Sequence, residues 1–170
     1  VVTDKMLKEL GLAEQALSGL VEAGVNLHWY AGVEPDPTFT QVLEGAEILR
    51  GAGCTAVVAV GGGSSMDAAK IIACTRFSNE SPDKWVGLNK VPDDILPIYA
   101  IPTTSGTGSE ATMGAVIKNP VEQVKTIIAA DGLLPRAVAL DPDLLLGMPP
   151  AVTAATGNRG SNTSRTSSPG

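Results

Sequence analysis

Helical and extended periods of hydrophobic residues alternate along the first half of the chain. Val1–Asp4 is typical of the end of a strand. Apolar residues then recur at helical spacing over Lys5–Gly24, and a glycine is a common helix end. Residues Val25–Tyr30 predict the next strand. The positions that define the helical face are Leu12, Ala16, Leu17, Leu20 and Val21.

The same alternation continues after a loop at residues 32–37, where Pro35 and Pro37 bar regular structure. Residues 40–50 form an amphipathic helical pattern, and the β-branched run Ala56–Val60 predicts a strand. Three glycines follow, and a further helical pattern extends to about Phe77. The apolar face of the 40–50 helix comprises Val42, Leu43, Ala46 and Leu49.

Strands that alternate with helices in this way predict a parallel sheet with right-handed crossovers. Ligands of such sheets bind at the carboxyl ends of the strands. We therefore expect Asp4, the glycine turn Gly61–Ser64 and the loop after Ile101 to lie along one edge of the sheet.

The second half of the chain has weaker patterns. Polar and proline-bearing composition predicts a surface loop at residues 78–97, and a hairpin is expected around Asn119-Pro120. From Gly157 the chain has no large apolar residue, so we expect a disordered tail. The further predicted elements are strands at Ile98–Ile101, Thr112–Lys118, Lys125–Ala129 and Ala137–Leu140, a short helix at Leu144–Gly147 and a helix start at Pro149–Thr156.

The glycine turn has the composition of a phosphate-binding loop. Glycines let a phosphate approach the backbone closely, and a following helix directs free N–H groups and its positive end at the same place. Ser64 and Asp67 fit a capping box. The turn is not a Walker A loop, and Met66 stands where a dinucleotide fingerprint has its third small residue, so a plain connector is the alternative.

A second loop, residues 102–110, carries five hydroxyl side chains and two glycines directly after a predicted strand. Such hydroxyls can donate hydrogen bonds to phosphate, ribose or amide oxygens. A flexible linker has a similar composition, but strand-like runs lie close on both sides of this loop.

Composition narrows the functional classes. With 170 residues, of which 44% are hydrophobic, the chain can form one domain, and its net charge of −6 argues against nucleic-acid or anionic-membrane partners. No apolar run reaches the roughly 18 residues of a membrane span, and no signal-peptide pattern is seen.

Cys54 and Cys74 fit reduced, buried thiols, so a cytoplasmic location is expected. One histidine, His28, cannot make a histidine-rich metal site or a Ser-His-Asp triad with its surroundings.

Taken together, the two loops resemble the iron-containing (group III) alcohol dehydrogenase family. The similarity extends over almost all of residues 1–157, and the pair of loops at this spacing is far more specific than either loop alone. The motifs that carry it are Gly61-Gly62-Gly63-Ser64-x-x-Asp67-x-x-Lys70 and Pro102-Thr103-Thr104-x-Gly106-Thr107-Gly108-Ser109-Glu110.

The resemblance implies an α/β fold, with a Rossmann-like parallel sheet, flanking helices and a β-hairpin, as in the N-terminal domain shared with dehydroquinate synthase-like proteins. It also implies an enzyme that interconverts alcohols and aldehydes or ketones with NAD. By similarity, Asp4 contacts the adenine ribose, which favours NAD over NADP because a carboxylate repels a 2′-phosphate. The implied cofactor-binding residues are Asp4, Gly61, Gly62, Gly63, Ser64, Asp67, Thr103, Thr104, Thr107 and Lys125.

The sequence departs from the family after Thr156-Gly157. The family continues into a helix with a metal-binding Asp and His, and Arg159 and Thr163 occupy those places here. We therefore expect no catalytic residue and no site for the family's divalent metal, iron or zinc, so that the chain alone is inactive. The expected division is an NAD-binding domain at residues 1–150, the start of a truncated helical metal-binding domain at 151–157 and a polar tail at 158–170.

Two alternatives remain open from the sequence. The chain can be a stand-alone nucleotide-binding module without catalysis, or a relative of dehydroquinate synthase or glycerol dehydrogenase on the same fold. The family resemblance further implies small alcohols or aldehydes as substrates and a homodimer or larger assembly.

Overall fold

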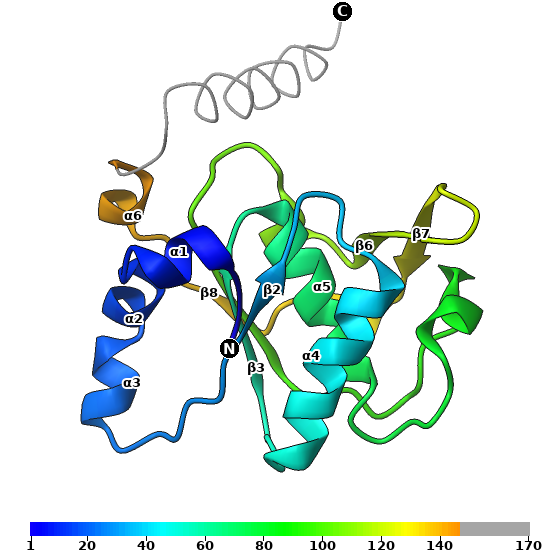
Figure 1. The fold of residues 1–170 in the computed structure, drawn as a ribbon, viewed down its shortest axis with the longest axis horizontal. Coiled ribbons are helices and arrows are strands. Elements are labelled where there is room, and N and C mark those ends of the chain that lie inside the picture. Colours follow the sequence, from blue (N-terminus) through cyan, green and yellow to red (C-terminus); the bar gives the residue numbers. More distant parts are fainter. Residues whose placement is uncertain (147–170) are drawn as a thin grey trace, which may run out of the picture.

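A five-stranded parallel sheet forms the centre of the molecule, in a computed structural model that describes residues 1–146 (Figure 1). The predicted helix start at 149–156 and the polar tail lie outside the described residues. The strand order is β2-β1-β3-β5-β8, and every neighbouring pair is parallel, which confirms the predicted α/β fold. The strands are β1 Val2–Asp4, β2 Tyr30–Val33, β3 Val57–Gly61, β5 Ile98–Pro102 and β8 Ala137–Val138.

Helices cover both faces of this sheet (Figure 1). The chain passes from β1 to β2 in one direction, and from β2 over β1 to β3 in the other. Right-handed crossovers in opposite directions place their helices on opposite faces. The first crossover consists of α1 Lys5–Glu9, α2 Leu12–Ala16 and α3 Ser18–Glu22, whereas α4 Phe39–Gly51 and α5 Gly63–Cys74 lie together on the other side.

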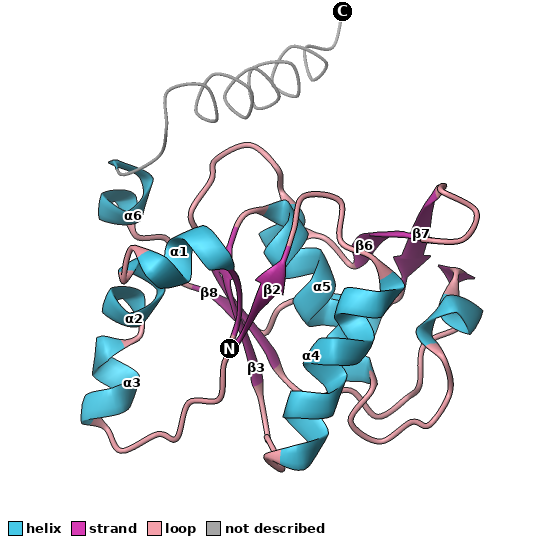
Figure 2. Cartoon of the chain, viewed as in Figure 1, coloured by secondary structure: helices cyan, strands magenta, loops and turns pink. Residues whose placement is uncertain are grey.

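A second, smaller sheet lies on the far side of α5 (Figure 2). Its strand order is β4-β7-β6, and the predicted hairpin is confirmed as the antiparallel pair β6 and β7, with Val116 opposite Ile127. Helix α5 is therefore enclosed between two sheets, and its residues from Ser65 to Cys74 are all buried. The strands are β4 Gly87–Leu88, β6 Gly114–Lys118 and β7 Lys125–Ala129.

The predicted helix over residues 5–24 and the predicted strand over residues 25–30 are wrong in their boundaries. Gly11 has a left-handed backbone, with φ +70°, and divides the helical stretch into short pieces. The strand begins only at Tyr30, whose register partner is Val2, although the His28 carbonyl still accepts from the Val1 amino group at 2.6 Å. Gly32 and Val33, predicted in a loop, belong to this strand.

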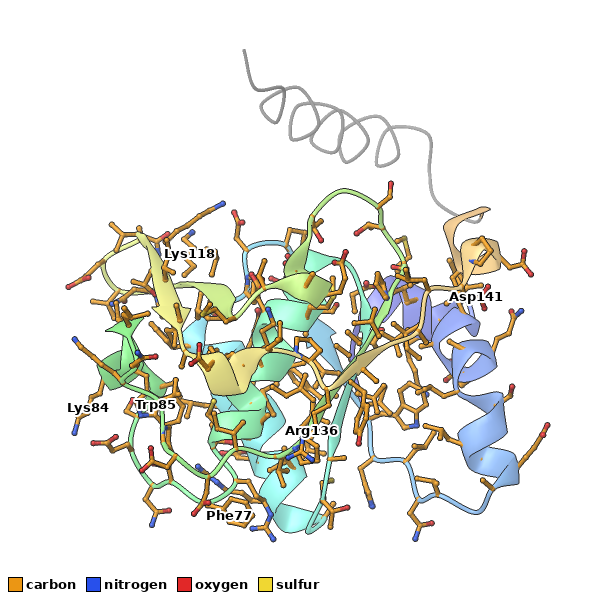
Figure 3. All side chains as sticks on the ribbon, turned by 180° about the vertical axis from the view of Figure 1, so that it is seen from behind. Phe77, Lys84, Trp85, Lys118, Arg136 and Asp141 are labelled. Carbon is orange, nitrogen blue, oxygen red and sulfur yellow. The ribbon has the colours of Figure 1, made fainter. Side chains whose placement is uncertain are left out.

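The prediction of a plain surface loop at residues 78–97 is also wrong. The segment contains a 3-10 helix, η1 Pro82–Trp85, and strand β4, which pairs with β7. Trp85 is only 1% exposed and its indole Nε1 donates to Glu80 Oε2 at 3.0 Å, whereas the adjacent Lys84 points outward (Figure 3). The strand predicted at 137–140 ends at Val138. The remaining elements are η2 Ser109–Ala111, η3 Asp131–Leu133 and α6 Pro142–Leu146.

Helix α4 begins with a complete capping box. Thr38 Oγ1 accepts from the backbone N–H of Gln41, and the Gln41 side chain accepts in return from the N–H of Thr38. Two N–H groups that the helix itself cannot satisfy are thereby paired. The helix then packs against α5, and Val42 and Ala46 are fully buried.

We expect Thr38→Ala to lower the free energy of unfolding by about 1 kcal/mol, because it removes the capping hydroxyl. Urea denaturation followed by circular dichroism measures this change. Thr40→Ala, the same change at an exposed position of the same helix, is the control and should lie within about 0.5 kcal/mol of the wild type. Equal stability of the two variants would contradict the assigned cap.

Candidate functional site

A cavity of about 560 Å³ lies at the carboxyl ends of the central strands. The strand order reverses between β1 and β3, and ligands of open α/β sheets bind at such a reversal. Both predicted loops contribute to the cavity wall. The predicted site residues that line it are Asp4, Gly62, Gly63, Ser64, Thr103, Thr104 and Thr107.

Gly61 forms the sharp turn from β3 into the site. Its φ is +151°, and a Cβ atom at this position would lie 2.5 Å from Ser65 Oγ. A side chain would therefore meet both backbone strain and a steric clash. The Gly61 carbonyl accepts from the N–H of Thr103 at 3.0 Å, which joins the glycine turn to the second loop.

The next two glycines face the second loop at close range. A Cβ at Gly62 would lie 3.2 Å from Thr104 Oγ1, and one at Gly63 would lie 3.2 Å from Ser109 Oγ and 3.4 Å from Thr107 Cβ. The turn can approach the hydroxyl-rich loop this closely because neither glycine carries a side chain. The two loops together form one wall of backbone and hydroxyl groups.

Helix α5 starts at this wall without a side-chain cap. Its N-cap residue is Gly62, and no side chain of the described residues accepts a hydrogen bond from its first turn. The predicted capping box of Ser64 and Asp67 is therefore wrong, because the N-cap residue is Gly62 and Ser64 already lies inside the helix. The first N–H groups of the helix are left for a ligand, and the positive end of the helix dipole favours an anion there.

Thr104 presents a polar atom that lacks a partner. Its Oγ1 is buried and makes no hydrogen bond within residues 1–146, although the residue lines the cavity. A buried hydroxyl without a partner is unfavourable. A ligand that accepts or donates a hydrogen bond at this point would satisfy it.

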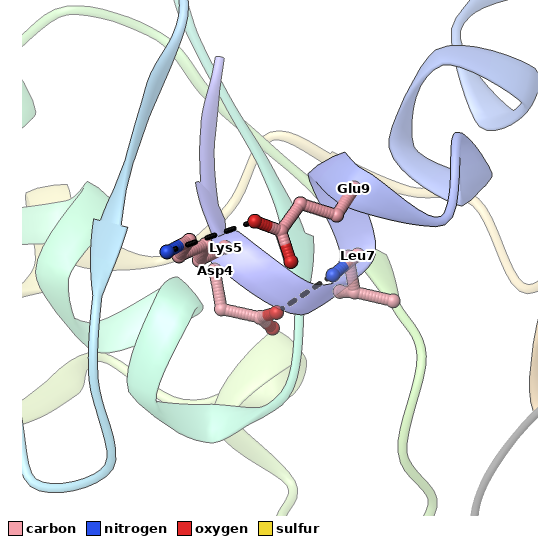
Figure 4. A network of polar contacts seen from close by, with 4 residues as sticks. All are labelled: Asp4, Lys5, Leu7 and Glu9. Atoms are coloured by element: carbon pink, nitrogen blue, oxygen red, sulfur yellow. Dashed lines mark hydrogen bonds and ion pairs between the residues drawn. The ribbon is translucent and has the colours of Figure 1, made fainter.

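Acidic side chains occupy the end of the cavity next to β1 and β2. Asp4 Oδ1 accepts from the N–H of Leu7 at 2.9 Å and so caps α1, while Lys5 pairs with Glu9 at 3.6 Å (Figure 4). Glu34 follows Val33, the register partner of Asp4, and also lines the cavity. The sequence analysis missed Glu34, because the strand that it follows was predicted to end at Tyr30 instead of Val33.

Asp67 lies behind the wall rather than in it. Its carboxylate Oδ2 accepts from the N–H of Val116 at 3.0 Å, and the side chain is 9% exposed. Burial raises the pKa of the Asp67 carboxyl, against the opposing effects of the Val116 N–H and the Lys70 ammonium. Asp67 therefore connects α5 to β6 in this structure.

Lys125 also lies outside the cavity lining. Its ammonium forms an ion pair with Asp36 Oδ1 at 2.6 Å, and both side chains are more than half exposed. Because the cavity rim includes Pro35, this ion pair ties the rim to the hairpin. Lys118 strengthens the same connection, since its N–H donates to the carbonyl of Pro37 at 2.7 Å.

A larger cavity of about 720 Å³ lies on the face of the sheet that α2 and α3 cover, and none of the predicted site residues lines it. It includes His28 and Cys54. Its apolar walls come from Leu17, Leu20, Val58, Tyr99, Ile101 and Val138.

Residues 1–146 contain no cluster of three or more His, Cys, Asp or Glu side chains that could hold a metal ion. His28 is exposed, and the cysteines are free, with Cys74 buried and Cys54 partly buried. Burial raises the pKa of the Cys74 thiol to about 12, so it stays protonated at neutral pH. In the part of the chain that is described, each helix is too short or too polar to cross a membrane.

Comparison with known proteins gives one consistent family. The family model "Iron-containing alcohol dehydrogenase" matches residues 1–142. The chain is 37% identical over 157 residues to the NAD-dependent methanol dehydrogenase of Bacillus methanolicus, and 36% identical over 159 residues to the lactaldehyde reductase of Escherichia coli. These alignments cover 92% of this chain, but 41% and 42% of the two relatives.

Solved structures agree with this assignment. A 1,3-propanediol oxidoreductase superposes with a TM-score of 0.88 at 37% identity, over 93% of this chain and 41% of that protein. The sulfoacetaldehyde reductase of Bifidobacterium kashiwanohense, solved with NAD+, gives a TM-score of 0.86 at 37% identity, over 93% and 42% of the two chains. The chain thus spans about two fifths of the length of its relatives.

Proposed function

The chain belongs to the iron-containing alcohol dehydrogenase family, and from this membership we propose that it forms the NAD-binding part of an alcohol dehydrogenase. One observation carries the proposal: the uncapped start of α5 faces the unpaired Thr104 hydroxyl across the side-chain-free Gly62. A dinucleotide has an anionic pyrophosphate for the helix start and oxygen atoms for the hydroxyl. The cavity is also of the size that small-molecule sites have.

Each group of the wall has a role in this proposal. The backbone N–H groups of Gly62, Gly63 and Ser64 hold the pyrophosphate, because they are the first free donors of α5. Thr104 and Thr107 orient the cofactor through their hydroxyls. Asp4 accepts from the adenine ribose. When bound, the nicotinamide supplies the means to accept or donate a hydride, and the chain's own residues bind and orient it.

For the whole enzyme, we propose interconversion of small alcohols with aldehydes or ketones, assisted by a divalent metal. The names of the relatives support this, since they act on methanol, lactaldehyde and 1,3-propanediol. The described residues offer no metal cluster, so in this proposal the metal is held by residues outside 1–146.

We expect the purified 170-residue chain to bind NADH, and Gly62→Val to weaken the binding at least tenfold. The valine side chain would occupy the narrow space between Gly62 and Thr104 and block the approach of the pyrophosphate. Fluorescence titration with NADH measures the affinity. Gly51→Val is the matched control, because a Cβ at Gly51 meets nothing within 4 Å. Failure of the wild-type chain to bind NADH would contradict the proposed function.

We expect the chain to prefer NADH over NADPH, and Asp4→Ser to remove most of that preference. The Asp4 carboxylate would repel a 2′-phosphate, whereas a serine hydroxyl can still cap α1 through the N–H of Leu7. Parallel titrations with both cofactors measure the ratio of affinities. Asp93→Ser makes the same change at an exposed position outside the cavity and should leave the ratio unchanged. An equal affinity of the wild type for NADH and NADPH would contradict the proposed role of Asp4.

We expect the chain to bind no stoichiometric iron or zinc and to oxidise no primary alcohol with NAD. A catalytic metal needs three or four converging protein ligands, and the sequence has a single histidine. Elemental analysis and an NAD-linked assay on the purified chain test this together. Alcohol oxidation by the chain together with a full equivalent of bound iron or zinc would contradict this expectation.

A further inference from the structure

Lys70 is a fully buried lysine whose ammonium is enclosed by oxygen atoms from one segment of the chain. Nζ donates to the carbonyls of Ser109 at 2.8 Å, Thr112 at 2.9 Å and Gly114 at 2.7 Å, and it lies 3.2 Å from Thr112 Oγ1. The residue is 0% exposed. No function described above uses this group.

A buried ammonium is stable only when its donors are paired, and here the pairing is almost entirely with main-chain carbonyls. Burial lowers the pKa of the Lys70 ammonium, while the nearby Asp67 and Glu110 carboxylates act in the opposite direction. Three carbonyls that converge on one cation fix the course of the backbone between Ser109 and Gly114. The bonds span 39 to 44 residues of sequence, so they hold the second loop against α5.

The fixed segment continues directly from the wall of the cavity. Ser109 provides one of the carbonyls, and its side-chain Oγ is also the atom nearest to a Cβ placed on Gly63. The N–H of Ser109 lies 3.4 Å from Thr107 Oγ1, and Thr107 lines the cavity. A shift of Ser109 would therefore move the hydroxyl wall relative to the start of α5. Asp67 adds a second connection, one turn earlier on the helix, through Val116.

We propose that Lys70 is a positioning residue for the cofactor site, which acts through the backbone of residues 109–114 to set the gap between the two loops. Lys70 does not line the cavity, so it does not touch the cofactor itself. The inference rests on the proposed function, because the ligand whose affinity it tunes is NADH.

The test compares NADH affinity in Lys70→Met and in a matched control. Lys70→Met keeps an unbranched side chain as far as the ε position and removes the ammonium, which leaves three carbonyls without their donor. We expect the affinity to fall about tenfold or more. Ile72→Ala is the control, because Ile72 is equally buried on α5 but its side chain faces Gly45 of α4. This control should destabilise the fold and leave the affinity within about twofold.

Two further measurements separate positioning from general loss of stability. Hydrogen exchange should become faster for amides of residues 107–116 in Lys70→Met, with no change in α4. In Lys70→Ala, n-propylammonium should restore part of the NADH affinity, because it replaces the missing side chain and its donors. Tetramethylammonium, which has the charge but no N–H, should not restore it.

The outcomes are distinguishable from failure of the proposed function. If the wild-type chain binds no NADH, the proposed function is wrong, and the inference about Lys70 is overturned with it. If it binds, an affinity within twofold for folded Lys70→Met, or an equal loss in Ile72→Ala, overturns the inference. Should Lys70→Met not fold, Thr112→Val decides, because it removes one oxygen from an exposed residue. For Thr112→Val we expect weaker NADH binding and faster hydrogen exchange in residues 107–116. If neither the affinity nor the exchange rate changes, the inference is overturned.

Discussion

Enclosure of helix α5 between two sheets is the constraint on which the rest of the structure depends. A helix with one exposed face can place polar residues in water, but the residues of α5 from Ser65 to Cys74 are all buried. Such a helix must be built from apolar and small residues, and each charged side chain needs a partner. Asp67 and Lys70 obey this rule, since their partners are the backbone of the second loop and of β6. The helix that starts at the cavity therefore also holds the second loop, which forms the cavity wall together with the glycine turn.

The parts of the fold that depend on local sequence could be predicted. The β-branched run before Gly61 fixes a buried strand, and the three glycines fix a sharp turn into a helix. Both follow from side-chain shape and backbone freedom over a few residues. The parallel order of the sheet follows from the alternation of strands and helices, and from it the placement of both loops at one edge. The hairpin was found for the same reason, because its two strands are close in sequence.

The errors came from contacts between distant segments. Trp85 lies in a polar, proline-bearing stretch, and nothing local indicates that it packs under the small sheet. Asp67 fits a helix cap by its spacing, but its partner Val116 is 49 residues away. The start of β2 was misplaced because the length of a strand depends on its pairing with a neighbour, and Tyr30 pairs with Val2, which is distant in sequence.

The candidate site combines both kinds of information. Its glycine half, Gly61–Ser64, is encoded locally, because the strand, the glycines and the helix that form it are consecutive in sequence. Its hydroxyl half is not, because residues 102–110 include two glycines and have few backbone hydrogen bonds of their own to define a shape. Their position comes from Gly61, whose carbonyl binds Thr103, and from Lys70, whose ammonium binds Ser109. Gly61 belongs to β3 and Lys70 belongs to α5. The position of the second loop therefore depends on the strand and the helix that flank the glycine turn.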